Sequence, residues 1–356
     1  MVETVQPGQK PYAVTRAVMH LALPPRTPYS RPSKTSPERR RRQLLQYLAY
    51  LVFGVLTVYL LIDWLSEDYT YTDDGVIPED ASVAIVTVLD EATMSKEYVE
   101  IIKENRDDYA KRHGYKNFYT NITTYSHLTK PSPSSWSMIP ALRHCLTLYP
   151  EMDYVWYLTP HALIMNPEVS LFDHVLSNLT NLMRKDIPVV PPDSVIHTFS
   201  HLKPSQVFLI LSQDGDNVAH TSFILRNTNK IPVPSDQPKE NWAYYFLDAW
   251  FDPLYRAYAF QKAENHALEH IVQWHPTVLA KLVMVDQRLI NSYNTQSDKS
   301  EVELEANRLR GMHDSQYRKG DLLVNFKGCA EDKDRDCEAE IKHFYADWKQ
   351  LAGRAR

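Results

Sequence analysis

The feature that most constrains this chain is an uncharged apolar run from Leu44 to Ile62. As an α-helix the run would span roughly 28 Å, about the thickness of the hydrocarbon core of a bilayer. A helix in the core of a globular protein seldom lacks a polar face over so many turns. We therefore expect a single transmembrane helix at 44–62 rather than a buried core helix.

The charges on either side of the run predict its orientation. Four arginines, Arg39 to Arg42, precede it, and Asp63, Glu67 and Asp68 follow it. The positive-inside bias then leaves the N-terminus cytosolic and the large C-terminal part lumenal. A cleaved signal peptide does not fit, because the run begins more than forty residues into the chain and is too long. Its length suits the thinner membranes of the early secretory pathway and the Golgi.

The rest of the chain divides by composition. Residues 1–43 are rich in Pro, Ser, Thr and Arg, which predicts a disordered cytosolic tail. We expect an acidic, polar stem at 63–81, a globular domain at 82–348 and a short tail at 349–356. The 356 residues, 44% hydrophobic and 23% charged, suit one large domain with appendages. The net charge of −5 gives no sign of a nucleic-acid partner.

Apolar periodicity predicts the fold class of the globular part. The β-branched run from Ser82 to Leu89 is typical of a buried strand. Further strands are expected at 153–158, 207–211, 221–225 and 322–326, and helices at 94–113, 137–148, 171–184 and 255–274. Strands that alternate with helices predict an α/β domain with a mainly parallel sheet. Nine glycines and no glycine-rich phosphate motif make a phosphate cradle of that kind unexpected.

Thr159-Pro160-His161 ends the apolar run Tyr154–Leu158. Ligands of open α/β sheets bind beyond the carboxyl ends of strands, and a sugar diphosphate there is usually neutralised by a divalent metal. One His and one Thr hydroxyl form a poor site for Mg²⁺ and a tolerable one for Mn²⁺. The alternative is a solvated His at a strand-to-turn junction.

A helical segment carries a second pattern, His266-Ala-Leu-Glu269-His270. It matches H-x-x-E-H, in which two His bind Zn²⁺ and the Glu is the base of a peptidase. The alternative is a helix whose His and Glu contact neighbouring polar groups. One turn earlier, Glu264 and Asn265 could contact the hydroxyls of a sugar or cap the helix.

The three cysteines and two glycosylation sequons bear on the compartment. Cys329 and Cys337 are close in sequence, and an oxidising lumen permits a bridge between them. Cys145 lies in a helical pattern and is expected to be a buried free thiol. Asn121-Ile-Thr and Asn178-Leu-Thr are consistent with glycosylation in the lumen.

Several segments together resemble glycosyltransferase family 34, the fungal galactosyl/mannosyltransferase family. They include V-T-V-L-D-E, S-S-W-S-M-I-P-A-L-R, V-W-Y-L-T-P-H-A-L-I-M-N-P, F-Q-K-A-E-N-H-A-L-E-H and L-L-V-N-F-K-G-C. The resemblance extends from about Val83 to Cys337. The blocks P-P-D-S-V-I and W-F-D-P-L-Y are similar to the α-1,6-mannosyltransferase branch, whose members are subunits of the Golgi mannan polymerase.

The resemblance implies a GT-A-like fold, a GDP-mannose or UDP-sugar donor, Mn²⁺ and retention of the anomeric configuration. The metal of the family is typically held by an Asp-x-Asp pair and a late His. Thr159 and His161 stand at the two Asp positions and Asn325 at the His position, so His161 and Asn325 are the weak metal candidates. The resemblance assigns the catalytic positions to Glu264 and Asn265. It assigns the donor-binding positions to Asn105, Arg106, Trp136, Thr159, His161 and Asp214.

The expected function is that of a Golgi α-1,6-mannosyltransferase, a single-pass type II membrane protein. It would transfer mannose from GDP-mannose to the outer-chain backbone of an N-glycan, in a hetero-oligomer with other mannosyltransferase subunits. The missing Asp-x-Asp pair favours an alternative, a catalytically impaired subunit that stabilises an active homologue. A more remote alternative is an H-x-x-E-H zinc peptidase.

Overall fold

The computed structural model describes residues 37–67, 81–215, 217–228, 241–258, 260–294 and 315–354. The chain divides into two compact units, Met1–Thr72 and Asp73–Arg356. The predicted tail up to residue 36, residues 68–80 of the predicted stem and the last two residues of the chain lie outside the described residues.

The described part of the first unit is one helix, α1 (Pro37–Glu67), which extends beyond the predicted span of 44–62 at both ends. Among the described helices it is the one long and apolar enough to cross a membrane, over Arg39–Leu60. None of that window is buried inside the protein. Exposed apolar side chains on every face of a helix are unfavourable in water, and the helix is compatible with a single-pass anchor.

The second unit is built on a six-stranded sheet with the order β2-β1-β3-β6-β5-β7. Five of these strands run in one direction and β6 runs against them, which confirms the predicted α/β class and mainly parallel sheet. A second, two-stranded sheet pairs β4 with β8. The strands are β1 (Val83–Leu89), β2 (Lys116–Asn121), β3 (Tyr154–Leu158), β4 (Ala162–Ile164), β5 (Leu209–Gln213), β6 (Val218–Arg226), β7 (Leu282–Val285) and β8 (Leu323–Asn325).

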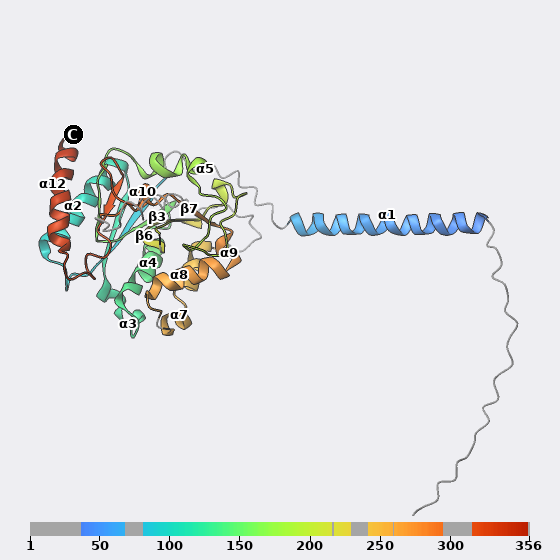
Figure 1. Ribbon diagram of the computed structural model, residues 1–356, viewed down its shortest axis with the longest axis horizontal. Helices are drawn as coiled ribbons and strands as arrows, with labels where there is room; N and C mark the ends of the chain where they lie inside the picture. The colour runs from blue at the N-terminus through green and yellow to red at the C-terminus, as the bar shows by residue number, and fades with distance from the viewer. Residues whose placement is uncertain are drawn as a thin grey trace, which may run out of the picture. The chain divides into compact units, whose positions relative to one another are not determined.

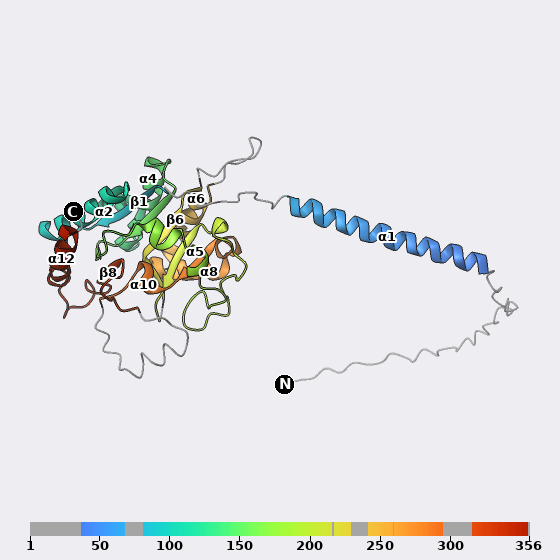
Figure 2. The same ribbon diagram turned by 90° about the horizontal axis from the view of Figure 1, so that it is seen from above.

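Helices cover both faces of the large sheet (Figures 1 and 2). The helices of this unit are α2 (Lys96–His113), α3 (Ser126–Thr129), α4 (Met138–Leu148), α5 (Leu179–Leu182), α6 (Trp242–Trp250), α7 (Pro253–Ala257), α8 (Ala263–Trp274), α9 (Pro276–Leu279), α10 (Gln287–Ile290) and α12 (Cys337–Arg354), with short helical turns η1 (Ile122–Tyr125), η2 (Ser134–Ser137), η3 (Phe172–Leu176) and η4 (Pro204–Gln206). Side chains alternate along β1, so Ala84 and Val86 pack with α4, α6 and α8. Val83 and Ile85 pack on the other face, with η3, α5 and α10.

Two predicted helices are broken, and both predictions were wrong in this respect. Residues 171–184 form η3 and α5, separated near Asn178, whose side chain accepts a hydrogen bond from Asn181. Residues 255–274 form α7 and α8. Their apolar periodicity continues into the break because Tyr255 of α7 and Phe260, which lies between the two helices, pack on the same core.

The C-terminal helix lies beside α2 (Figure 1), where Lys342 forms a 2.9 Å ion pair with Glu97. Cys329 and Cys337 form a disulfide at the start of α12, and Cys145 is a buried free thiol. Helix α12 continues through the predicted domain boundary at 348. The predicted boundaries themselves stay predictions.

Candidate active site

The five strands that run in one direction all end at the same edge of the large sheet. The strands β1, β3, β5 and β7 run in one direction, so Asp90, Thr159, Asp214 and Asp286 follow their carboxyl ends. Strand β6 runs the other way and begins at this edge with Val218. Ligands of open α/β sheets bind at such an edge, which makes it the candidate site.

Glu264, in the first turn of α8, lies in this region with its carboxylate enclosed. Its side chain is 8% exposed. One carboxylate oxygen accepts a 2.6 Å hydrogen bond from the Ser135 hydroxyl, and the other lies 3.4 Å from Nε2 of His220 on β6. The indole of Trp250 donates to the Glu264 carbonyl at 2.8 Å. Two segments distant in sequence therefore hold the carboxylate, and a third holds the backbone of the same residue.

The surroundings of Glu264 keep it charged. Burial raises the pKa of Glu264, but the hydrogen bond and the charge of His220, together with the hydrogen bond from Ser135, hold it below its usual value. The carboxylate is therefore ionised near neutral pH. The adjacent Asn265 is buried, and its side-chain oxygen has no hydrogen-bond partner. Buried polar oxygens in folded proteins usually have a hydrogen-bond partner, so the side chain of Asn265 is an exception at this position.

Helix α8 starts from a strained residue. Ala263 has φ of 42°, in the left-handed region that non-glycine residues rarely adopt. The strained residue directly precedes Glu264, so the backbone turn fixes where the carboxylate enters the site. Strain of this kind is concentrated at functional positions in proteins.

Two lysines flank the turn between β5 and β6. Asp214 accepts hydrogen bonds from the Tyr293 hydroxyl at 3.1 Å and from the backbone N–H of Asn217 at 2.7 Å, and it pairs with Lys327. The side chain of Asn217 accepts from Lys262, two residues before Glu264. Asp214 was assigned to the donor site by resemblance, a role that stays a prediction, whereas the two lysines were missed. Lys327 could have been noticed in the N-F-K-G-C segment.

Asn325 lies on β8, opposite Ala162 of β4, and its side-chain amide is hydrogen-bonded to other side chains of the protein. It is buried and donates to Oγ1 of Thr221 at 2.8 Å and to the side-chain oxygen of Asn291 at 2.6 Å. Its own side-chain oxygen has no partner. The next residue, Phe326, donates its backbone N–H to the His161 carbonyl at 2.8 Å. His161 therefore lies in the turn just before β4, next to the strand β8 that carries Asn325, and the metal-binding role of the two residues stays a prediction.

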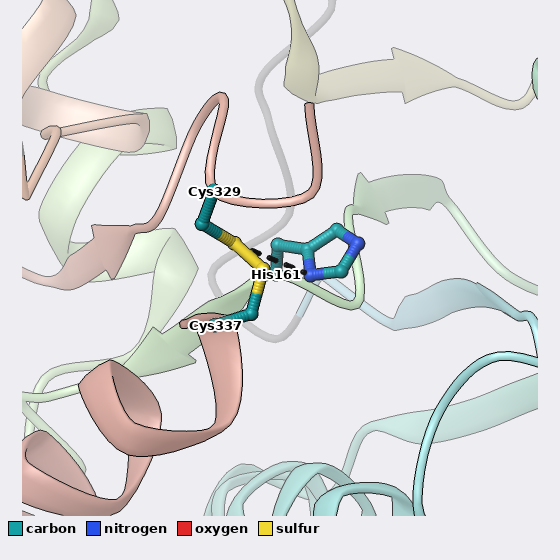
Figure 3. Close-up of side chains that lie close together, drawn as sticks. All are labelled: His161, Cys329 and Cys337. Carbon is teal, nitrogen blue, oxygen red and sulfur yellow. Dashed lines mark hydrogen bonds between the residues drawn. A yellow bond between two sulfur atoms is a disulfide. The ribbon is translucent and has the colours of Figure 1, made fainter. Parts of the chain in front are cut away.

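His161 packs against the disulfide (Figure 3). Its Nδ1 lies 2.8 Å from the Tyr98 hydroxyl and 3.8 Å from Sγ of Cys329. Burial lowers the pKa of His161, which leaves the imidazole neutral near pH 7. His161, Cys329 and Cys337 have side-chain atoms close enough together to bind one metal ion. Among the described residues, they are the one such group of three made of His, Cys, Asp or Glu. The disulfide removes both thiolates, so this group does not fit a metal.

A divalent metal also fits poorly at the positions that the resemblance assigns to it. Thr159, His161 and Asn325 offer only neutral donors, and Thr159 Oγ1 already lies 3.4 Å from the His161 backbone N–H. Asp214, the neighbouring carboxylate, is paired with Lys327. Hard divalent cations prefer several anionic oxygens. The described residues do not supply such a set, so the Mn²⁺ of the resemblance stays a prediction, and no chemical step is derived from it.

Three of the predicted donor-binding side chains lie behind the site. Arg106 is fully buried and donates to the Thr159 carbonyl at 2.6 Å. Asn105 donates to the Ile164 carbonyl at 2.9 Å and accepts from its N–H at 2.8 Å. Trp136 is 1% exposed. In this structure Asn105 and Arg106 hold the backbone of the Thr159–Ile164 segment, and direct contact with a donor stays a prediction.

The H-x-x-E-H segment does not assemble as a zinc site. Glu269 accepts from the Val218 backbone N–H at 3.0 Å, and His266 lies 4.0 Å from its other oxygen. The His270 ring instead packs against Tyr255, with centroids 5.4 Å apart. Within the described residues these side chains form no three-ligand group. The segment is helix scaffold beside Glu264.

Comparison with solved structures finds glycosyltransferases. One is described as a glycosyltransferase involved in the glycosylation of the major capsid of PBCV-1. It is 10% identical, with a TM-score of 0.45, and the match covers 74% of this chain and 98% of that one. Another is the galactosyltransferase LgtC in complex with donor and acceptor sugar analogues, 12% identical with a TM-score of 0.40, over 76% of this chain and 95% of that one.

Comparison with curated sequences finds fungal transferases. The chain is 30% identical over 260 residues to the uncharacterized alpha-1,2-galactosyltransferase C8D2.17 of Schizosaccharomyces pombe, over 70% of this chain and 68% of that protein. It is 29% identical over 273 residues to the probable alpha-1,6-mannosyltransferase MNN11 of Saccharomyces cerevisiae, over 74% and 61%. The chain spans 56% to 68% of the length of four such relatives. Residues 79–336 match the family described as galactosyl transferase GMA12/MNN10, and because this match covers most of the chain, the protein belongs to that family.

Proposed function

We propose that the protein is a hexosyltransferase that moves mannose from GDP-mannose onto the α-1,6-linked backbone of an N-glycan outer chain. The proposal places α1 in a Golgi membrane, with residues 82–348 in the lumen and other mannosyltransferase subunits as partners. It is supported by membership of the family, by the likeness to a probable α-1,6-mannosyltransferase and by the apolar helix.

The observation that carries the proposal is the ionised, enclosed carboxylate of Glu264. Transfer of a glycosyl group passes through a state with positive charge developing at the anomeric carbon. A fixed carboxylate beside that carbon stabilises the charge, and it does so strongly because water is excluded. Ser135 and His220 hold the carboxylate in place, so little reorganisation is needed during the reaction.

The lysines supply the opposite charge for the departing nucleoside diphosphate. Lys262 and Lys327 lie on either side of the turn that contains Asp214 and Asn217. A lysine binds phosphate as a point charge and needs no metal to do so. Negative charge that develops on the leaving group would thus lie near two cations of the chain itself.

One feature favours a second candidate function, a non-catalytic subunit that stabilises an active homologue. The neutral side chains of Thr159, His161 and Asn325 stand where the family resemblance expects two Asp and a His. A subunit that only positions its partner would not need a charged metal site. The buried, hydrogen-bonded Glu264 argues against this candidate, because an ionised carboxylate is costly to bury without a use.

The test is a transfer assay with the full-length chain in detergent, using GDP-mannose or UDP-galactose with α-1,6-mannobiose as acceptor. Each donor is assayed with added Mn²⁺ and with EDTA. Transfer from GDP-mannose that is lost in Glu264→Gln supports the proposal. Transfer only from UDP-galactose would correct the donor, and folded protein that binds no nucleotide sugar and transfers nothing would favour the non-catalytic subunit.

A further inference from the structure

A row of five contacting rings runs from the end of α7, through the segment between the helices, along α8, and none of the five rings contacts the carboxylate of Glu264 in the described part of the chain. The row is made of Tyr258, Phe260, Tyr255, His270 and Trp274. Successive ring centroids are 4.7, 6.2, 5.4 and 6.5 Å apart. Neither the sequence motifs nor the proposed chemistry accounts for this row.

Both ends of the row are open to solvent. The exposed fractions are 74% for Tyr258 and 61% for Trp274. Large aromatic side chains bury most of their surface in a typical fold, and a connected exposed set marks a contact surface. The middle of the row is fixed, because Tyr255 and Phe260 pack on the core and the Tyr255 hydroxyl lies 3.2 Å from Nε2 of His275. The row is therefore preformed and needs little ordering on binding.

The row is continuous with the candidate site. The Phe260 ring lies 6.3 Å from the His266 ring, and the Phe260 carbonyl accepts from the Ala263 N–H at 3.0 Å. Ala263 directly precedes Glu264. Phe260, the second ring from the Tyr258 end of the row, is thus hydrogen-bonded to the residue that precedes Glu264, and this end of the row is the one nearest to Glu264 along the chain.

We propose that this row of rings is the acceptor platform, on which successive hexose units of a neutral oligosaccharide stack while the end of the chain lies at Glu264. The inference rests on the proposed function and names the part of the surface that its acceptor uses. Aromatic rings offer broad apolar faces with a polar edge, which matches the alternating C–H and hydroxyl faces of a hexose. Tyr, Phe, Trp and a neutral His carry no charge, and burial lowers the pKa of His270. A neutral glycan fits this row better than an anionic ligand.

The test measures binding directly, apart from turnover. The full-length chain in detergent, saturated with GDP, is titrated calorimetrically with α-1,6-mannotetraose and with α-1,6-mannobiose. The variants are Tyr258→Ala and Trp274→Ala, and the matched control is Tyr245→Ala, an exposed tyrosine on α6 outside the row. We expect each row variant to weaken mannotetraose binding about 2- to 12-fold, with mannobiose and GDP less affected and the control unchanged.

The possible outcomes distinguish a failure of the proposed acceptor platform from a failure of the proposed transfer reaction. Mannotetraose affinity that is unchanged in both row variants overturns the platform even where transfer to mannobiose persists. Loss of a co-purifying subunit from the variants, without a change in glycan affinity, also overturns it and makes the row a protein interface. A row-dependent mannotetraose affinity in a chain that transfers no sugar supports the platform while the proposed reaction fails.

Discussion

Glu264 accepts a 2.6 Å hydrogen bond from Ser135, although the two residues lie 129 positions apart in the chain. Ser135 belongs to η2, and His220, on the other side of the carboxylate, belongs to β6. The charge state of Glu264 is therefore a property of the assembled fold rather than of the α8 sequence.

The substitution Glu264→Gln removes the charge but keeps the shape and an acceptor for Ser135. We expect transfer from the sugar nucleotide to fall about 10²- to 10³-fold, because fixed electrostatic stabilisation of the transition state is lost. The affinity for GDP should change little, since the proposed function places the carboxylate at the sugar rather than at the nucleotide. Turnover and GDP titration of the same preparation check both points. Turnover within threefold of the parent protein would remove Glu264 from catalysis.

Ser135→Ala and His220→Gln each remove a group that lowers the pKa of Glu264. Since its pKa is below the usual value in the folded protein, the carboxylate stays charged well into the acid range. Each variant raises the pKa of Glu264, so the acid limb of the kcat/KM profile should move to higher pH, while activity on the alkaline side is retained. His266→Gln is the matched control, because His266 faces Glu269 rather than Glu264. An unmoved acid limb in both variants would show that Glu264 does not set it.

Ala263→Gly tests whether the start of α8 stores strain. At φ of 42° an alanine costs roughly 1–2 kcal/mol that glycine does not. We expect the substitution to raise the free energy of unfolding by about 1 kcal/mol. Ala267→Gly, inside the same helix, is the control and should lower the free energy of unfolding by about 1 kcal/mol or more. Chemical denaturation of both variants makes the comparison, and a destabilising Ala263→Gly would contradict the strain.

The Cys329–Cys337 disulfide closes a short loop against His161. Replacing both cysteines by serine should lower the free energy of unfolding by about 2–3 kcal/mol, because the unfolded chain is no longer constrained. Dithiothreitol should lower the thermal midpoint of the parent protein and leave that of the double variant unchanged. Cys145→Ala keeps the bridge and serves as the control. If dithiothreitol does not change the thermal midpoint of the parent protein, the disulfide is absent or does not stabilise the fold.

Much of the fold could be predicted from apolar patterns. The predicted strand from Ser82 to Leu89 is confirmed as β1, Val83–Leu89, in which every residue is buried. Strand β2 was missed because its sequence, K-N-F-Y-T-N, has one fully buried position at the edge of the sheet. The three residues of β4 are too few to show a period. The break before α8 was missed because the residue with the positive φ angle is Ala263, and an alanine gives no sign of such an angle in the sequence.

The site could be predicted only in part, for a different reason. Glu264 and Asn265 were assigned by resemblance, and the structure encloses both. Ser135, His220 and Lys262 were not foreseen, since each is an ordinary polar residue until the fold brings it to the sheet edge. Ion pairs and hydrogen bonds between segments distant in sequence produce no local pattern in the sequence from which they could be predicted.

Arg106 has a consequence for how this protein should be mutated. Its guanidinium is enclosed, donates to the Thr159 carbonyl and leaves Nε without a partner. Replacing Arg106 removes the hydrogen bond to Thr159 at the end of β3, so we expect the backbone there to shift even if the arginine does not contact a substrate. A screen that scores activity alone would therefore count Arg106 among the substrate contacts. Only a parallel record of folded yield for every variant separates a scaffold residue of this kind from a true ligand contact.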